Sequence, residues 1–234
     1  MKTIGIIGGT SWFSTADYYK KINEQTAEVL GGSHSAKILL YSVDFSEFKA
    51  YVDDSNWEAA GLMFSDIARR LEQAGADFIV IASNTPHTIA DTVSQKIGIP
   101  LLHIAEATGA AISENRVSKV GLIGTWPTME GNFFSSRLLE KGIETLTPGK
   151  ADRDYIHQAV FTELTQGIFK EDTKNRMLAI IDELGAAGAE AIIFGCTEFG
   201  LLIQQRESSL PVYDTAEIHI KAIVQYAITP ETNS

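Results

Sequence analysis

The residue of this chain best suited to chemistry is its only cysteine, Cys196, at the end of a short apolar run typical of a buried strand. The surrounding stretch, A-G-A-E-A-I-I-F-G-C-T-E from residue 187, has a twin in the first half of the chain, A-G-A-D-F-I-V-I-A-S-N-T from residue 74. The two stretches align without a gap, and the alignment pairs Ser83 with Cys196. Each half therefore carries one side chain that could exchange a proton at the end of the same predicted strand.

A thiol in this position is a usable acid, base or nucleophile near neutral pH. A free cysteine titrates at about 8.5, and a helix that begins just after Cys196 would lower that pKa through its dipole. A lone cysteine is also commonly a small buried hydrophobe. The strand-end position and the hydroxyl residues around Cys196 favour the catalytic interpretation.

Short polar side chains also follow the matching strand of the first half. Ser83, Asn84 and Thr85 offer hydroxyls, an amide and backbone N–H groups, which suit a carboxylate ligand. The same residue types cap helices equally well, so the triplet alone leaves both interpretations open. His87 and His219 also follow predicted strand ends, and for them we favour ordinary half-buried packing over a role in the site.

The motifs for metal and nucleotide binding are missing from the sequence. No spacing of His, Cys and Asp resembles a metal site. The glycines of residues 5–9 fit neither the dinucleotide fingerprint nor a P-loop. We therefore expect neither a metal nor a nucleotide cofactor.

Composition narrows the possible partners further. A net charge of −11 argues against nucleic acid and against anionic membranes, and the chain has no apolar run of about 18 residues. One cysteine cannot form an internal disulfide, which fits a reducing compartment. We expect a cytoplasmic protein with a small-molecule ligand, and 234 residues allow one large domain or two small ones.

Strands and helices are predicted to alternate along the whole chain, which gives parallel sheets with helices on both faces. Predicted strands cover residues 3–7, 37–43, 78–82, 120–123, 191–194 and 212–213. Predicted helices cover residues 14–30, 104–115, 132–140 and 154–166, the stretches around Met63–Leu71 and Met177–Leu184, the segment after Pro86, and a terminal helix capped by Asp214. Residues 45–57 show no clean period, and we expect a long loop there. Ligands of such sheets bind at the carboxyl ends of the strands, where the polar residues named above fall.

Four motifs together resemble the aspartate/glutamate racemase family. They are M-K-T-I-G-I-I-G-G-T-S-W at the start of the chain, S-N-T-P-H from Ser83, G-C-T-E from Gly195 and D-T-A-E-I-H from Asp214. The resemblance covers essentially the whole chain. It implies an α/β fold of two similar flavodoxin-like domains, related by a pseudo-dyad, with the active site in the cleft between them. We expect residues 1–100 plus 210–234 in one domain and 101–209 in the other.

The resemblance also implies a cofactor-independent (PLP-independent) amino-acid racemase, usually a homodimer, that acts on aspartate or glutamate. In such a two-base mechanism one cysteine removes the α-proton and another reprotonates the opposite face. Cys196 matches the second cysteine, and Ser83 stands where the first is usual. The implied substrate-binding residues are Thr10, Asn84, Thr85, Thr125, Thr197 and Glu198.

Ser83 is the most informative departure from the family pattern. An alcohol is a far weaker acid than a thiol, so we expect an asymmetric or impaired racemase in which Ser83 or water serves the second face. Two alternatives stay open: a single-cysteine lyase resembling arylmalonate decarboxylase, and a non-catalytic amino-acid binding protein. An acidic substrate also needs a cation for its second carboxylate, and Lys49 is a weak candidate.

Overall fold

The computed structural model describes residues 1–230 and divides the chain into two compact units. The first unit contains residues 1–103 and 219–230, and the second contains residues 104–218. Each is an α/β unit around a four-stranded parallel sheet, as the alternation of strands and helices predicts. The domain boundaries expected at residues 100 and 210 stay a prediction.

The first unit has the strand order β2-β1-β3-β4. Its strands are β1 (Thr3–Gly8), β2 (Lys37–Ser42), β3 (Phe78–Ile81) and β4 (Leu101–Leu102). Its helices are α1 (Trp12–Leu30), α2 (Phe45–Asp53), α3 (Trp57–Gln73), η1 (Thr85–Ile89) and α4 (Ala90–Ser94), and α11 (Thr215–Ile228) enters it from the second unit.

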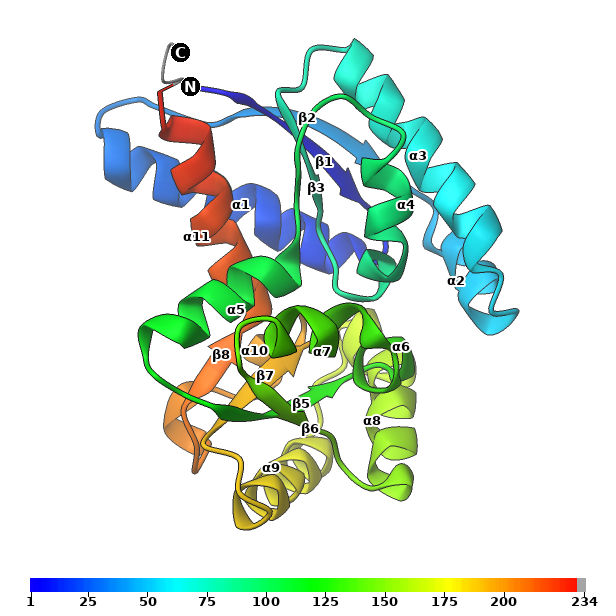
Figure 1. Cartoon of the computed structure of the whole chain (residues 1–234), viewed down its shortest axis with the longest axis vertical. Helices are drawn as coiled ribbons and strands as arrows, with labels where there is room; N and C mark the ends of the chain where they lie inside the picture. Colours follow the sequence, from blue (N-terminus) through cyan, green and yellow to red (C-terminus); the bar gives the residue numbers. More distant parts are fainter. Residues whose placement is uncertain (231–234) are drawn as a thin grey trace. The chain divides into compact units, whose positions relative to one another are not determined.

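Helices cover both faces of this sheet (Figure 1). Ile79 and Ile81 of β3 belong to the core shared with α3, which includes the fully buried Phe64. The neighbouring residue Phe78 points to the other face, where its ring meets Tyr226 of α11 edge-on at 4.9 Å between ring centres. Because both faces are covered, the sequences of β1 and β3 are nearly continuous apolar runs.

The second unit repeats this order as β6-β5-β7-β8. Its strands are β5 (Lys119–Gly124), β6 (Glu144–Leu146), β7 (Ala191–Gly195) and β8 (Val212–Asp214). Its helical elements are α5 (Ile104–Glu114), α6 (Trp126–Glu130), α7 (Asn132–Leu139), α8 (Lys150–Thr162), η2 (Leu164–Gln166), α9 (Glu171–Ala186), α10 (Phe199–Leu202) and η3 (Gln205–Glu207). Ile192 and Phe194 of β7 face the core with α8 and α9, whereas Ile193 faces the core with α5 and α7.

The prediction of a loop over residues 45–57 is wrong, because residues 45–53 form α2 and α3 begins at Trp57. The side chain of Asp44 accepts a hydrogen bond from the N–H of Ser46 and so caps the helix, which also holds the pKa of Asp44 below its usual value. Phe48 is the one fully buried side chain of α2. One apolar anchor gives too little periodicity for sequence analysis to detect.

Two other helices differ in extent from the expectation. The segment after Pro86 consists of two short pieces, η1 and α4, instead of one helix reaching residue 98. The first helix begins at Trp12 rather than Ser14, because Ser11 supplies the capping oxygen to the N–H of Ser14. In the described part of the chain, no helix combines the length and apolar character needed to cross a membrane.

Candidate functional site

The candidate residues of the first unit lie just after β3 and β1. Ser83 is half-buried, and Asn84 and Thr85 are buried. Asn84 stands at the N-cap of η1, yet its side chain makes no capping hydrogen bond to the described backbone. The capping alternative for this triplet therefore does not account for Asn84.

The turn after β1 brings Thr10 to the same edge of the sheet. Gly9 has φ of +92°, and a Cβ there would collide with the backbone of Val43, so only glycine fits. The hydroxyl of Thr15 accepts a hydrogen bond from the N–H of Gly9 at 2.8 Å and donates to the carbonyl of Ser11 at 2.9 Å. Thr10 is buried in this fixed turn.

Behind Ser83 lies a cluster of three buried histidines, His87, His103 and His219. Nδ1 of His87 donates to the carbonyl of Ser83 at 2.7 Å, and the rings of His87 and His103 meet edge-on at 4.6 Å. His87 therefore fixes the backbone at Ser83. The expectation of ordinary half-buried packing leaves out this hydrogen bond, and His87 is in fact buried.

The hydrogen bonds of His219 define the tautomer of its neutral ring. Nε2 lies 3.0 Å from the carbonyl of Leu102 and must be the donor, so Nδ1 accepts from the hydroxyl of Tyr18 at 3.2 Å. Burial lowers the pKa of His219 from 6.5 to about 4, against the opposing effect of the Leu102 carbonyl. His219 is a neutral structural residue at neutral pH.

In the second unit, Cys196 follows β7 and is only 6% exposed. Its Sγ donates to Oε2 of Glu198 at 3.0 Å, and the hydroxyl of Thr197 donates to the same oxygen at 2.8 Å. Glu198 is 3% exposed, and its other oxygen, Oε1, is buried without a hydrogen-bond partner among the described residues. A thiol, a hydroxyl and a carboxylate thus form one compact group.

This environment acts on Cys196 in the direction opposite to the one expected. Burial raises the pKa of the thiol well above its ordinary value, and the negative charge of Glu198, its hydrogen bond with the thiol and the charge of Asp214 raise it further. The helix after Cys196, α10, has only four residues and starts at Phe199. The expected lowering by a helix dipole is therefore wrong, and the resting thiol is neutral.

Thr125 lies at the end of β5, next to the stacked rings of the exposed Trp126 and the half-buried His157. Its hydroxyl contacts that of Thr128 at 3.2 Å. Trp126 stacks on His157 with ring centres 3.7 Å apart, and its Nε1 donates to Asp154 at 3.1 Å. The side chain of Trp126 therefore has a fixed orientation beside the carboxyl ends of β5 and β7.

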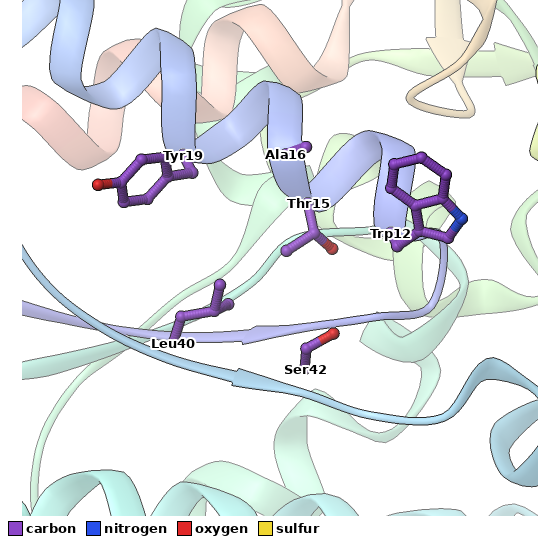
Figure 2. A pocket seen from close by; sticks show the side chains of 6 residues that line it. All are labelled: Trp12, Thr15, Ala16, Tyr19, Leu40 and Ser42. Carbon is purple, nitrogen blue, oxygen red and sulfur yellow. The ribbon is translucent and has the colours of Figure 1, made fainter.

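The structure also bears on Lys49, on one cavity of the first unit and on metal binding. Lys49 lies on α2 and forms an ion pair with Asp53, four residues further along the helix. A cavity of about 370 Å³ lies between α1 and the edge strand β2, and Figure 2 shows Trp12 and Leu40 on its wall. Neither Ser83 nor Asn84 lines it. No group of three or more His, Cys, Asp or Glu among residues 1–230 is arranged to hold a metal ion.

The structure thus gathers the candidate residues into two groups, one in each unit. The first contains Thr10, Ser83, Asn84 and Thr85, and the second contains Thr125, Cys196, Thr197 and Glu198. A shared cleft stays a prediction. The sequence did not indicate Tyr18, Thr15 and Thr128, since buried polar residues on helices give no spacing signal, nor His103, which follows the two-residue strand β4.

Comparison with known proteins matches residues 7–223 to the Asp/Glu/hydantoin racemases. The chain belongs to the Asp/Glu/hydantoin racemase family. The resemblance inferred from the four motifs is therefore confirmed. Family membership supports an amino-acid racemase as the general class of activity.

Individual relatives in this family cover nearly the whole chain. The broad specificity amino-acid racemase RacX of Bacillus subtilis (strain 168) is 24% identical over 94% of this chain and 96% of its own. A candidate Asp/Glu racemase from Yersinia pestis is 44% identical, covers 98% of this chain and 100% of its own, and superposes with a TM-score of 0.91. An aspartate racemase homologue from Pyrococcus horikoshii OT3 is 36% identical with the same coverage and a TM-score of 0.84. These matches confirm the α/β fold of two units.

Proposed function

We propose that this chain is a cofactor-independent amino-acid racemase that acts on aspartate, glutamate or a close analogue. The observation that carries the proposal is the equivalence of β3 and β7, whose ends present Ser83 and Cys196 in units of the same strand order. Membership of the racemase family supports it. Asn84, Thr85, Thr125 and Thr197 would bind the α-carboxylate and α-amino groups.

The two proton-transfer groups differ in strength, so the reaction is asymmetric. Cys196 exchanges the α-proton on one face of the substrate, and Ser83 or a water molecule serves the other face. Because an alkoxide is far harder to form than a thiolate, proton transfer at the second face is slow. One enantiomer therefore exchanges its α-proton readily and inverts slowly.

A second function is favoured by the neutral state of the thiol. Burial and Glu198 hold Cys196 in its acid form, which suits delivery of a proton to one face of an enediolate. A single-thiol lyase of the decarboxylase type would use such a donor. The thiol of a racemase must in addition lose its proton during the cycle.

Deuterium exchange separates these functions. L- and D-aspartate and L- and D-glutamate are each incubated with the protein in D₂O, and loss of the α-proton signal and inversion are followed by NMR. Fast exchange of one enantiomer with slow inversion supports the asymmetric racemase. Equal, rapid exchange of both enantiomers overturns the asymmetry. No exchange in any sample overturns the racemase proposal for these substrates and favours a lyase or a binding protein.

A further inference from the structure

We infer that Oε1 of Glu198 is the binding site for the α-ammonium group of the substrate. The inference rests on the proposed function and assigns one substrate group to one atom. Glu198 is 3% exposed, and its two carboxylate oxygens have very different surroundings. Oε2 accepts two hydrogen bonds, from Cys196 and Thr197, whereas Oε1 has none among the described residues.

A buried carboxylate oxygen without a donor is energetically costly, and a charged one more so. A carboxylate offers about four acceptor positions, of which the thiol and the hydroxyl occupy two. No Lys or Arg of residues 1–230 forms an ion pair with Glu198. A ligand that meets Oε1 must therefore supply N–H or O–H donors, and a positively charged donor satisfies the carboxylate best.

The α-ammonium of an amino acid has both properties. It carries three N–H donors and one positive charge, and in an amino acid it is bound to the carbon whose proton is exchanged. Binding it at Oε1 would place the α-carbon near the sulfur of Cys196, because Sγ lies 3.0 Å from Oε2 of the same carboxylate. A dicarboxylic acid without the amino group would leave Oε1 unsatisfied.

Ammonium binding also changes the state of the thiol. The negative charges of Glu198 and Asp214 both disfavour the thiolate of Cys196. A bound ammonium beside Glu198 offsets that charge, so the thiol loses its proton to solvent more readily in the complex than in the free protein. The substrate would thus help to create the base that acts on it.

Binding measurements on Glu198→Gln test the assignment, with Glu140→Gln, which alters an exposed carboxylate of the same unit, as the matched control. L-Aspartate and succinate are titrated into each protein by calorimetry. We expect the affinity for aspartate to fall about 10- to 100-fold in Glu198→Gln while that for succinate stays constant or rises. Equal losses for both ligands, or no loss for aspartate, overturn the inference. If Glu198→Gln does not fold, Glu198→Asp gives the same discrimination through a shorter side chain.

A second readout needs no substrate. Cys196 is the only cysteine, so the rate of iodoacetamide alkylation against pH reports that thiol alone. We expect the midpoint to fall in Glu198→Gln, with Asp214 retaining part of the shift, and alkylation near neutral pH to be about tenfold faster per unit of pKa lost. A more reactive thiol together with weaker aspartate binding supports the inference. An unchanged midpoint overturns it even if the wild type exchanges α-protons, whereas failure of the wild type to exchange any amino acid overturns the proposed function itself.

Discussion

The ends of β3 and β7 occupy the same place in two units of the same strand order, yet their surroundings are chemically opposite. After β3, Ser83 is half-buried, and its carbonyl is held by His87 in a cluster of buried imidazoles. After β7, Cys196 is buried and donates to the carboxylate of Glu198. The fold thus determines where each candidate side chain lies, and the neighbouring side chains determine what it can do.

The two units also differ in what holds their main titratable side chain in its neutral form. In the first unit, burial keeps His219 neutral. In the second, burial and the carboxylates of Glu198 and Asp214 raise the pKa of Cys196 and keep its thiol protonated. An acidic pH should therefore disturb the first unit, while loss of a carboxylate should disturb the second.

The largest effect is expected from Cys196→Ala. A positioned acid or base contributes about 10²- to 10⁴-fold to a proton transfer, and the thiol is the stronger of the two groups, so we expect α-proton exchange to fall by about 10³-fold or more. NMR exchange in D₂O measures this. Aspartate binding by calorimetry is the control, because a binding protein would retain it. Racemisation that persists without the thiol would show that the mechanism is wrong.

Acid should destabilise the first unit through His219. Its pKa is lowered from 6.5 to about 4 in the folded state, so the unfolded chain binds the proton more tightly. The stability that comes from neutral His219 is present above about pH 6.5 and is lost as the pH falls towards 4, by about 3 kcal/mol in total.

Urea unfolding across this pH range measures the loss. His219→Gln keeps a donor for the carbonyl of Leu102 but cannot titrate, so its stability should depend less on pH. His34→Gln, which changes an exposed histidine of the same unit, should behave as the wild type. Identical pH dependence in all three proteins would contradict the assignment.

Replacing Ser83 by cysteine should make the two strand ends alike. A thiol in place of the alcohol supplies a much better acid for the second face, and we expect inversion to accelerate by about 10²-fold. Polarimetry or chiral chromatography of aspartate follows the inversion. Ser46→Cys adds a thiol at an exposed position of the same unit and should leave the rate unchanged. A Ser83→Cys protein that inverts no faster would show that Ser83 does not face the reacting carbon.

The smallest expected effect is on stability, and it comes from two threonines that pack against equivalent glycines. A Cβ on Gly8 would collide with Thr15, and one on Gly124 would press on Thr128 at 3.0 Å. Thr15→Val leaves the buried N–H of Gly9 without its acceptor, which should cost about 1–3 kcal/mol.

Thr128→Val removes only one contact between hydroxyls, so we expect a loss of about 1 kcal/mol or less. Both losses are measured by urea unfolding. Equal losses would mean that the two turns depend on their threonines in the same way.

Most of the fold could be predicted from the sequence because its strands are buried on both faces. Continuous apolar runs identified β1, β3, β5 and β7, and the internal repeat indicated two similar halves. The pattern did not predict β4 and β6, whose two and three residues have no measurable period. The strand β8 is equally short, but Pro211 directly before it marked its start. The helix α2 was missed because Phe48 is its only fully buried residue.

The candidate site was predictable in position but not in its electrostatics. Strand ends and motifs located Ser83, Cys196 and Glu198. The pKa of the thiol depends on how deeply it is buried and on which oxygen of Glu198 it meets, and both are properties of packing. The histidine cluster likewise depends on β4 and α11, which bring His103 and His219 together from distant parts of the sequence.

The buried, protonated thiol of Cys196 also affects how the protein withstands oxidants. Peroxides react with thiolates far faster than with thiols, and mostly with those that solvent can reach. Cys196 is 6% exposed and its thiol donates a hydrogen bond to Glu198, so it offers neither property at rest. Its conversion to sulfenic acid should therefore be slow in the free protein, even though this is the one residue on which turnover is proposed to depend.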